Sequence, residues 1–99
     1  MKSMLSLDQI FRPSADVVAC DLSDGKALLS LETSKYFKLN DSAAVVWASV
    51  ETGAKLEQIV DAMLQRFDVD KATCTDDVLA ILEIFNKAGL IETSDLAPS

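Results

Sequence analysis

Four aspartates between the second and third predicted helices are the first candidates for chemistry. Asp68, Asp70, Asp76 and Asp77 lie within a short span, and carboxylate oxygens are the ligands that Ca²⁺ prefers. The span lacks the glycine at position six and the glutamate at position twelve of a calcium-binding loop. We therefore interpret these side chains as solvated carboxylates and helix caps, and we predict no metal site and no cofactor.

Nucleophilic catalysis also lacks its usual components. The chain has no histidine, the commonest general base. Cys20 and Cys74 are far apart and form no CxxC pair, so we interpret both as small apolar side chains in a reducing compartment, with a disulfide left open. The nearby helix start could lower the pKa of Cys74, but no base accompanies it. We predict that the protein is not an enzyme.

Length and charge narrow the class of protein further. The chain has 99 residues, 49% of them hydrophobic, and a formal net charge of −7. One small domain with a real core is expected, with an N-terminal arm over residues 1–15, the domain over 16–92 and a flexible tail over 93–99. The acidic balance argues against nucleic acids and anionic membranes as partners. We find no signal peptide and no apolar run near the ~20 residues of a membrane span, and expect a cytoplasmic protein.

Residues 35–39 form the stretch with the clearest functional implication. Tyr36, Phe37 and Leu39 favour a strand. Lys35 and Lys38 suit the edge of a sheet, where charge discourages random pairing with other chains. An edge strand can also accept an extended peptide through main-chain hydrogen bonds. We therefore predict that a peptide binds along this strand, with the last helix as the opposite wall.

The strand at 35–39 is predicted to be the third of an antiparallel meander. Residues 16–22 and 26–31 read as the first two strands, and Asp24-Gly25 between them is a strong turn signal. Alternation places Phe37 and Leu39 in the core. Tyr36 is then half exposed, and we interpret its ring as a cover for the sheet rather than as a ligand contact.

Three helices are expected after the strands. The first begins at Ser42 behind an Asn40 or Asp41 cap, contains Trp47 in its core face and ends at Thr52 and Gly53. The second carries one apolar stripe. Its members are Leu56, Ile59, Val60, Met63, Leu64 and Phe67.

The third helix is more apolar than packing requires. It is expected to begin near Thr73 or Thr75, with Asp76 and Asp77 near its positive end, and to stop at Gly89. Leu79 and Ile84 fall on opposite flanks of its core face. The Ile84 flank, which also holds Asp77, Ile81 and Ala88, could line a groove, contact the N-terminal arm or form a dimer. The chain from Glu92 onward reads as a frayed end.

Taken in order, these features resemble the PqqD-like family. The resemblance covers roughly residues 16–92. It rests on the following motifs: Asp24-Gly25-Lys26-Ala27-Leu28-Leu29, Tyr36-Phe37-Lys38-Leu39-Asn40, Val46-Trp47, the stripe from Leu56 to Leu64, Phe67-Asp68-Val69-Asp70, and Gly89-Leu90-Ile91.

The resemblance implies an α+β fold, with a three-stranded antiparallel sheet followed by three helices in a winged-helix-like arrangement. It implies a recognition element for ribosomally synthesised and modified peptides (RiPPs), most like the free-standing leader-binding proteins of lasso-peptide biosynthesis. Such proteins hand a precursor to a leader peptidase, ahead of a cyclase. A PQQ-type chaperone that presents its precursor to a radical enzyme is the alternative. The third strand and the helix at about 76–88 would hold the leader.

The candidate leader-binding residues come from both walls: Ser34, Lys35, Tyr36, Phe37, Lys38, Asp77, Ile81, Ile84 and Ala88. Backbone groups of residues 34–37 are expected to pair with the leader. Ile81, Ile84 and Ala88 are expected to form an apolar pocket for an aromatic residue or a proline, and Asp77 and Lys35 to orient polar groups. The rival classes are a winged-helix DNA-binding domain, which the acidic third helix disfavours, and a dimerisation module that uses the Leu79 and Ile84 flanks.

Overall fold

Strands and helices alternate little along this chain, which is an α+β protein in the computed structural model. The structure describes residues 9–95. The elements in order are β1 (Gln9–Pro13), β2 (Val17–Leu22), β3 (Gly25–Ser30), β4 (Tyr36–Leu39), α1 (Asp41–Val50), β5 (Ala54–Lys55), α2 (Leu56–Arg66), α3 (Lys71–Lys87) and β6 (Ile91–Asp95).

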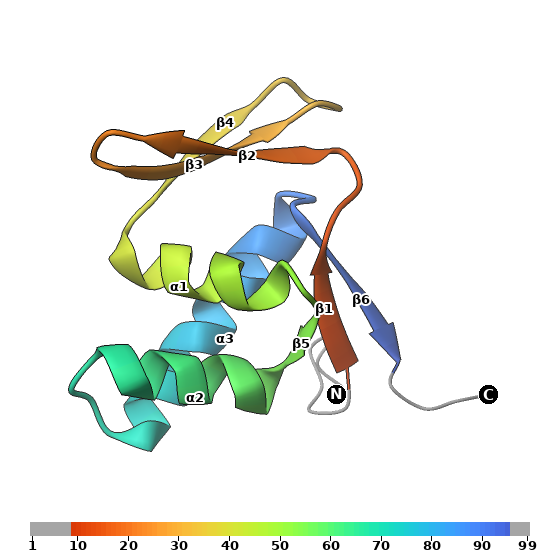
Figure 1. Ribbon diagram of the computed structural model, residues 1–99. Coiled ribbons are helices and arrows are strands. Elements are labelled where there is room, and N and C mark those ends of the chain that lie inside the picture. Colours follow the sequence, from red (N-terminus) through yellow and green to blue (C-terminus); the bar gives the residue numbers. More distant parts are fainter. Residues whose placement is uncertain (1–8, 96–99) are drawn as a thin grey trace.

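The predicted meander is confirmed as one three-stranded antiparallel sheet in the order β2-β3-β4. Gly25 turns the chain between β2 and β3 with a φ of 150°, a value that favours glycine. Leu28 pairs with Phe37 across β3 and β4. Leu28 is fully buried and Leu39 nearly so, which puts this face of the sheet against the helices (Figure 1).

A second sheet, with the order β5-β1-β6, was not predicted. β1 lies within the expected N-terminal arm, and the rest of that arm up to residue 8 lies outside the described residues. The prediction of a frayed end from Glu92 is wrong for residues 92–95, because they form β6 and pair with β1, Thr93 opposite Phe11. Residues 96–99 of the expected tail also lie outside the described residues. Phe11 is fully buried, so pairing anchors both termini of the domain on the core.

The helix starts agree with prediction for α1 and differ for α3. The Asn40 side chain accepts a 2.8 Å hydrogen bond from the Ala43 amide and caps α1. α3 begins at Lys71, earlier than the predicted Thr73 or Thr75, because Asp70 caps it by accepting from the Thr73 amide at 3.2 Å and the Thr73 hydroxyl at 2.9 Å. Asp76 and Asp77 therefore lie beyond the first turn of the helix.

The core joins the three helices to both sheets. Trp47 is buried, as predicted, and meets Phe85 edge to face with ring centroids 5.9 Å apart. Its indole N–H donates to a Glu51 carboxylate oxygen at 3.0 Å. Of the α2 stripe, Leu64 and Phe67 are only partly buried, and the other members are buried. The rigid core fixes where β4 and α3 face one another.

Candidate functional site

β4 is an edge strand among the residues that the structure describes. It pairs with β3 on one side, and no strand between residues 9 and 95 pairs with its other side. The N-terminal segment in β1 belongs to the other sheet, so it does not cover this edge. In Figure 1, β4 runs along the margin of the upper sheet, directly before the chain enters α1.

Two hydrogen bonds establish which backbone groups of β4 point outward. The Ser30 amide donates to the Lys35 carbonyl at 2.8 Å, and the Leu31 amide donates to the Asp16 carbonyl at 2.7 Å. In an antiparallel ladder, hydrogen-bonded pairs alternate with non-bonded pairs. With the observed register, Phe37 and Leu39 therefore direct their amide and carbonyl groups toward β3.

The outward-facing backbone groups of β4 thus belong to Tyr36 and Lys38. Each presents one amide and one carbonyl to the open side of the strand. The expected pairing range of 34–37 needs correction on geometric grounds. The backbone groups of Lys35 and Phe37 face β3, and Ser34 has a φ of +60°, which takes it out of the extended conformation of the strand.

A cavity of about 180 Å³ lies between β4 and α3. Its depth is apolar, since Phe85 and Leu90 are 3% and 1% exposed. Ile84, in contrast, is 63% exposed and stands at the rim. The lining residues are Phe37, Lys38, Leu39, Asn40, Ala43, Ile81, Ile84, Phe85 and Leu90. The cavity therefore adjoins the open edge and offers an apolar recess beside it.

Only part of the predicted site gathers around this cavity. Phe37, Lys38, Ile81 and Ile84 line it. The remaining predicted residues, which are not among its lining, are Ser34, Lys35, Tyr36, Asp77 and Ala88. Tyr36 still contributes its backbone to the edge. Asp77 lies exposed in the N-terminal half of α3, and Ala88 is the half-buried C-cap of that helix.

The sequence reasoning missed five lining residues, and they fall into two groups. Leu39, Asn40 and Ala43 come from the junction between β4 and α1, while Phe85 and Leu90 come from the end of α3 and its exit. Leu39, which alternation places in the core, and Phe85 are also buried core residues. The sequence feature that could have identified the first group is the short connection from β4 to α1. Because this connection is short, its residues must lie beside the cavity that β4 borders.

Charge around the groove is modest. The Lys38 ammonium forms an exposed ion pair with Asp24 at 2.9 Å. Lys35 makes no ion pair with any residue between 9 and 95 and is exposed. Exposed pairs contribute little energy. A ligand bound at this cavity would therefore gain most of its affinity from apolar burial and from main-chain hydrogen bonds to β4.

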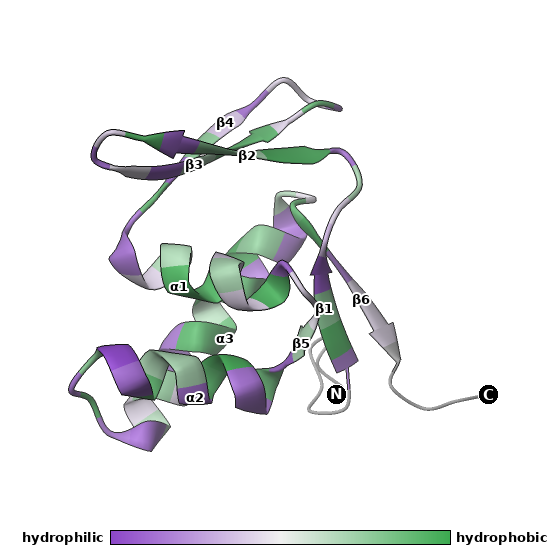
Figure 2. Cartoon of the chain, viewed as in Figure 1, coloured by the Kyte–Doolittle hydropathy of each residue, from purple (hydrophilic) through white to green (hydrophobic). Residues whose placement is uncertain are grey.

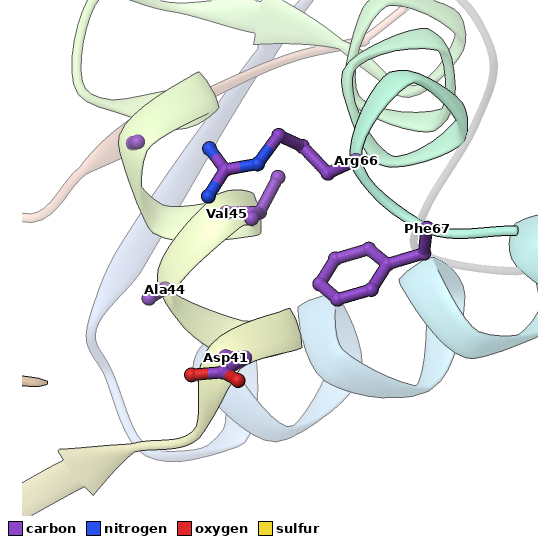
Figure 3. Close-up of a pocket in the computed structure, with 6 residues that line it drawn as sticks. Asp41, Ala44, Val45, Arg66 and Phe67 are labelled. Carbon is purple, nitrogen blue, oxygen red and sulfur yellow. The ribbon is translucent and has the colours of Figure 1, made fainter.

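A second hollow, of about 320 Å³, lies between α1 and α2 (Figure 3). Ala44, Val45 and Ala48 of α1 form one side, and Arg66 extends across from α2 while the Phe67 ring points toward α1. Both walls are helices whose backbone groups are already bonded within the helix. This hollow offers no open strand edge, so the smaller cavity beside β4 is the better candidate for binding an extended chain.

Cys74 and Asp70, two of the side chains considered for chemistry, have structural roles in the fold. Cys74 is 1% exposed, and its thiol lies 3.7 Å from the Val60 carbonyl. Burial, reinforced by the charges of Asp77 and Asp70, raises the pKa of Cys74, so the nearby helix start does not lower it. Hydrogen bonds from the Thr73 hydroxyl and amide lower the pKa of Asp70, as expected of a cap.

The described residues contain neither a cluster of metal ligands nor a membrane-spanning helix. Between residues 9 and 95, no three cysteine or acidic side chains lie close enough together to hold a metal ion. Over the same part of the chain, no helix has the length and apolar character needed to cross a membrane.

The chain matches a known protein family. Residues 25–91 match the sequence model of coenzyme PQQ synthesis protein D (PqqD). That segment runs from β3 to the start of β6 and includes both walls of the cavity. The comparison with curated proteins returned no match.

Three solved structures share the fold. TbiB1, solved in complex with the TbiA(beta) leader peptide, is 32% identical with a TM-score of 0.77, over 82% of this chain and 94% of that one. Lasso peptide synthetase B1, complexed with the leader peptide, is 20% identical with a TM-score of 0.76, over 83% of this chain and 96% of that one. The PqqD part of Methylobacterium extorquens PqqCD, a stand-alone RiPP recognition element, is 24% identical with a TM-score of 0.72, over 89% and 94%.

Proposed function

Because this chain belongs to the PqqD family, we propose that it binds the leader segment of a ribosomally synthesised precursor peptide. The leader lies as an added strand along β4, and the protein delivers it to a leader peptidase in lasso-peptide biosynthesis. The observation that carries the proposal is the open edge of β4 beside an apolar cavity. TbiB1, the relative at 32% identity, was solved with a leader peptide bound.

Main-chain pairing supplies part of the affinity. The two outward amides and two outward carbonyls of Tyr36 and Lys38 can form four hydrogen bonds. Their summed net contribution is roughly 2–6 kcal/mol. Micromolar binding needs about −8 kcal/mol, and ordering a flexible peptide adds a further cost. The remainder must come from apolar side chains of the leader, at about 1.5–3 kcal/mol for each one fully buried.

The register of the added strand determines which leader residues enter the cavity. Residues directly opposite one another in a sheet point to the same face. A leader residue opposite Phe37 therefore points toward Ile81 and Ile84, while its two neighbours, opposite Tyr36 and Lys38, point away. A cavity of about 150 Å³ holds a benzene ring. The 180 Å³ recess thus suits one aromatic residue or a proline.

The proposed role is binding and presentation without catalysis. We propose the leader peptidase and the cyclase of the same pathway as protein partners, with no part for nucleic acid or membrane. The exposed charges of α3 support this. Its three carboxylates, Asp76, Asp77 and Glu83, outnumber its two lysines, Lys71 and Lys87, where a DNA-binding helix would need an excess of cations. A precursor made on the ribosome appears in the cytoplasm, and we place the protein there.

The description of the matching family favours one second candidate. A PQQ-type chaperone would present its precursor to a radical enzyme through the same groove. The two roles differ in the cognate peptide and in the enzyme that receives it. Binding assays with leaders encoded beside each class of partner enzyme separate them.

Titration of a fluorescently labelled leader peptide tests the proposal. Tyr36→Pro removes an outward amide from an edge strand, a position that tolerates proline. We expect leader affinity to fall by roughly tenfold or more, because the lost hydrogen bond and the altered edge affect the guest strand directly. Tyr36→Phe keeps the amide and is the matched control.

Circular dichroism must show that the Tyr36→Pro variant remains folded. A folded variant that binds the leader as tightly as Tyr36→Phe would contradict pairing along β4. Phe37→Pro is a useful contrast, because its amide faces β3. That change should destabilise the sheet itself.

A further inference from the structure

The hollow between α1 and α2 continues along both helices. A second hollow of about 280 Å³ adjoins it, and Val45, Ala48 and Arg66 line both. We call the two hollows together the helix groove. Several of its lining residues are small, namely Ala44, Ala48, Ser49 and Ala62. Short side chains leave space at the surface between the two helices, so the helix groove can accept side chains from another segment.

Arg66 is an exposed cation in the helix groove. It forms no ion pair with any residue between 9 and 95. In Figure 3 its guanidinium extends toward α1 and lies well apart from the Asp41 carboxylate. A guanidinium presents a planar set of N–H donors that matches the geometry of a carboxylate. The ligand side chain that complements this part of the helix groove is therefore acidic.

The surface around Arg66 is largely apolar. Val45 and Phe67 are half-buried and pack against the core, and the Phe67 ring points toward α1 (Figure 3). Figure 2 shows the hydrophilic end of α2 beside the more hydrophobic α1. A segment that complements the helix groove therefore carries an apolar residue for Val45 and Phe67 and an acidic residue for Arg66.

The helix groove begins where the leader site ends. Asn40 and Ala43 line the cavity beside β4, while Asp41 and Ala44 line the helix groove. The first turn of α1 therefore borders the cavity on one side and the helix groove on the other. A peptide that continues past the end of β4 at Leu39 reaches the helix groove within this turn.

The direction of the added strand decides which end of the leader reaches this turn. Both pairings in the β2-β3-β4 sheet are antiparallel, and sheets of a single type are over-represented. A leader strand that keeps this pattern runs opposite to β4, so its N-terminal side lies beyond Leu39. Asp41 and Ala48 are about 10 Å apart along α1, a length that about three extended residues span.

We propose that the part of the leader upstream of the β4-paired strand binds in the helix groove, with an apolar side chain against Val45 and Phe67 and a carboxylate on Arg66. This inference rests on the proposed function, since it takes the leader to be paired with β4. It adds a second recognition surface, where contacts come from side chains because the helix backbones are already bonded. The helix groove thus discriminates among leaders that pair equally well with β4.

Two substitutions and two peptides test the assignment. Arg66→Glu reverses the charge in the helix groove, and Lys71→Glu makes the same charge change at an exposed lysine outside its lining. The probes are the fluorescently labelled leader of the precursor encoded beside this chain, and the same leader without the residues upstream of its exchange-protected segment. Titration gives the Kd of each peptide for each protein.

We expect Arg66→Glu to raise the Kd of the full-length leader roughly fivefold, because an exposed ion pair becomes a repulsion. The Kd of the shortened leader should change by less than about twofold, as should both Kd values in Lys71→Glu. Equal effects of Arg66→Glu on the two peptides would overturn binding in the helix groove and leave pairing with β4 intact. Failure of the unaltered chain to bind either peptide would overturn the proposed function, and this inference with it.

A spin label on the leader gives a readout that does not depend on affinity. A label just upstream of the exchange-protected segment should broaden the amide NMR signals of Ala44 and Ala48, and a label just downstream should not. The reverse pattern would mean a parallel leader and would overturn the assignment. If Arg66→Glu slows precursor processing or dissociates a dimer while both leader Kd values stay unchanged, the helix groove belongs to a partner enzyme or to a second copy instead.

Discussion

Ile84 combines an apolar side chain with a 63% exposed position at the rim of the cavity. Its neighbour on the helix, Ile81, is half-buried against the core. An isoleucine left in water contributes little to folding, yet it becomes favourable once a ligand covers it. Ile84 is therefore the side chain whose replacement best separates binding from stability.

Ile84→Ser should raise the Kd of the leader roughly tenfold, because burial of this side chain by the peptide is lost. The free energy of unfolding should change by no more than about 0.5 kcal/mol, as for other exposed positions. Fluorescence titration and urea unfolding measure the two quantities. Glu83→Ser, an exposed neighbour outside the cavity lining, is the control, and equal effects of the two changes would refute the role given to Ile84.

At the scale of the elements, α3 is capped at its N-terminus by Asp70, a residue that the sequence alone does not single out. Several residues near its start can cap a helix, and the choice of Asp70 is visible only in its bonds to Thr73. Asp70→Ala should lower Tm by roughly 5 °C at neutral pH, since the helix loses its cap. Asp68→Ala, a neighbouring exposed carboxylate, should have little effect.

The effect of the cap should depend on pH with a defined sign. The pKa of Asp70 is lower in the folded protein than its ordinary value, so the carboxylate stabilises the fold above the unfolded pKa of about 3.9. That contribution is lost as pH falls through the lowered folded pKa. The Tm difference between Asp70→Ala and the unaltered chain should therefore shrink in acid, and a difference that stays constant to low pH would contradict the cap.

The elements that sequence reasoning identified are those with strong local patterns. Alternation around Phe37 and Leu39 predicted β4, and the stripe from Leu56 to Phe67 predicted α2. β5 and β6 are short or polar and form because β1 pairs with them, which is a contact between distant parts of the chain. The outward direction of Tyr36 and Lys38 likewise depends on the register with β3, which no local pattern encodes.

In the whole molecule, the two elements that border the cavity, β4 and α3, are each anchored on the rest of the fold. β4 is anchored on β3, and α3 is anchored on the core through Val78, Leu82 and Phe85. The second sheet ties the chain before β2 to the chain after α3, through pairing of β1 with β6. Such a scaffold keeps the groove preformed, so a leader peptide meets a rigid edge and only the peptide must order on binding.

The β2-β3-β4 sheet has two edge strands among residues 9–95, β2 and β4, and the cavity beside α3 borders β4. β2 also lacks a second partner among residues 9–95, and the register leaves Val17, Ala19 and Asp21 with outward backbone groups there. The 180 Å³ cavity adjoins β4. A ligand that needs both main-chain pairing and an apolar pocket should therefore select β4 over β2.

Amide hydrogen exchange followed by NMR, with and without a saturating leader peptide, tests this selection most directly. The account predicts that the Tyr36 and Lys38 amides exchange quickly in the free protein and become protected when the leader binds. The Phe37 and Leu39 amides, which face β3, should be protected in both states. New protection at Val17, Ala19 and Asp21 instead, or none at Tyr36 and Lys38 under saturation, would contradict strand addition at β4.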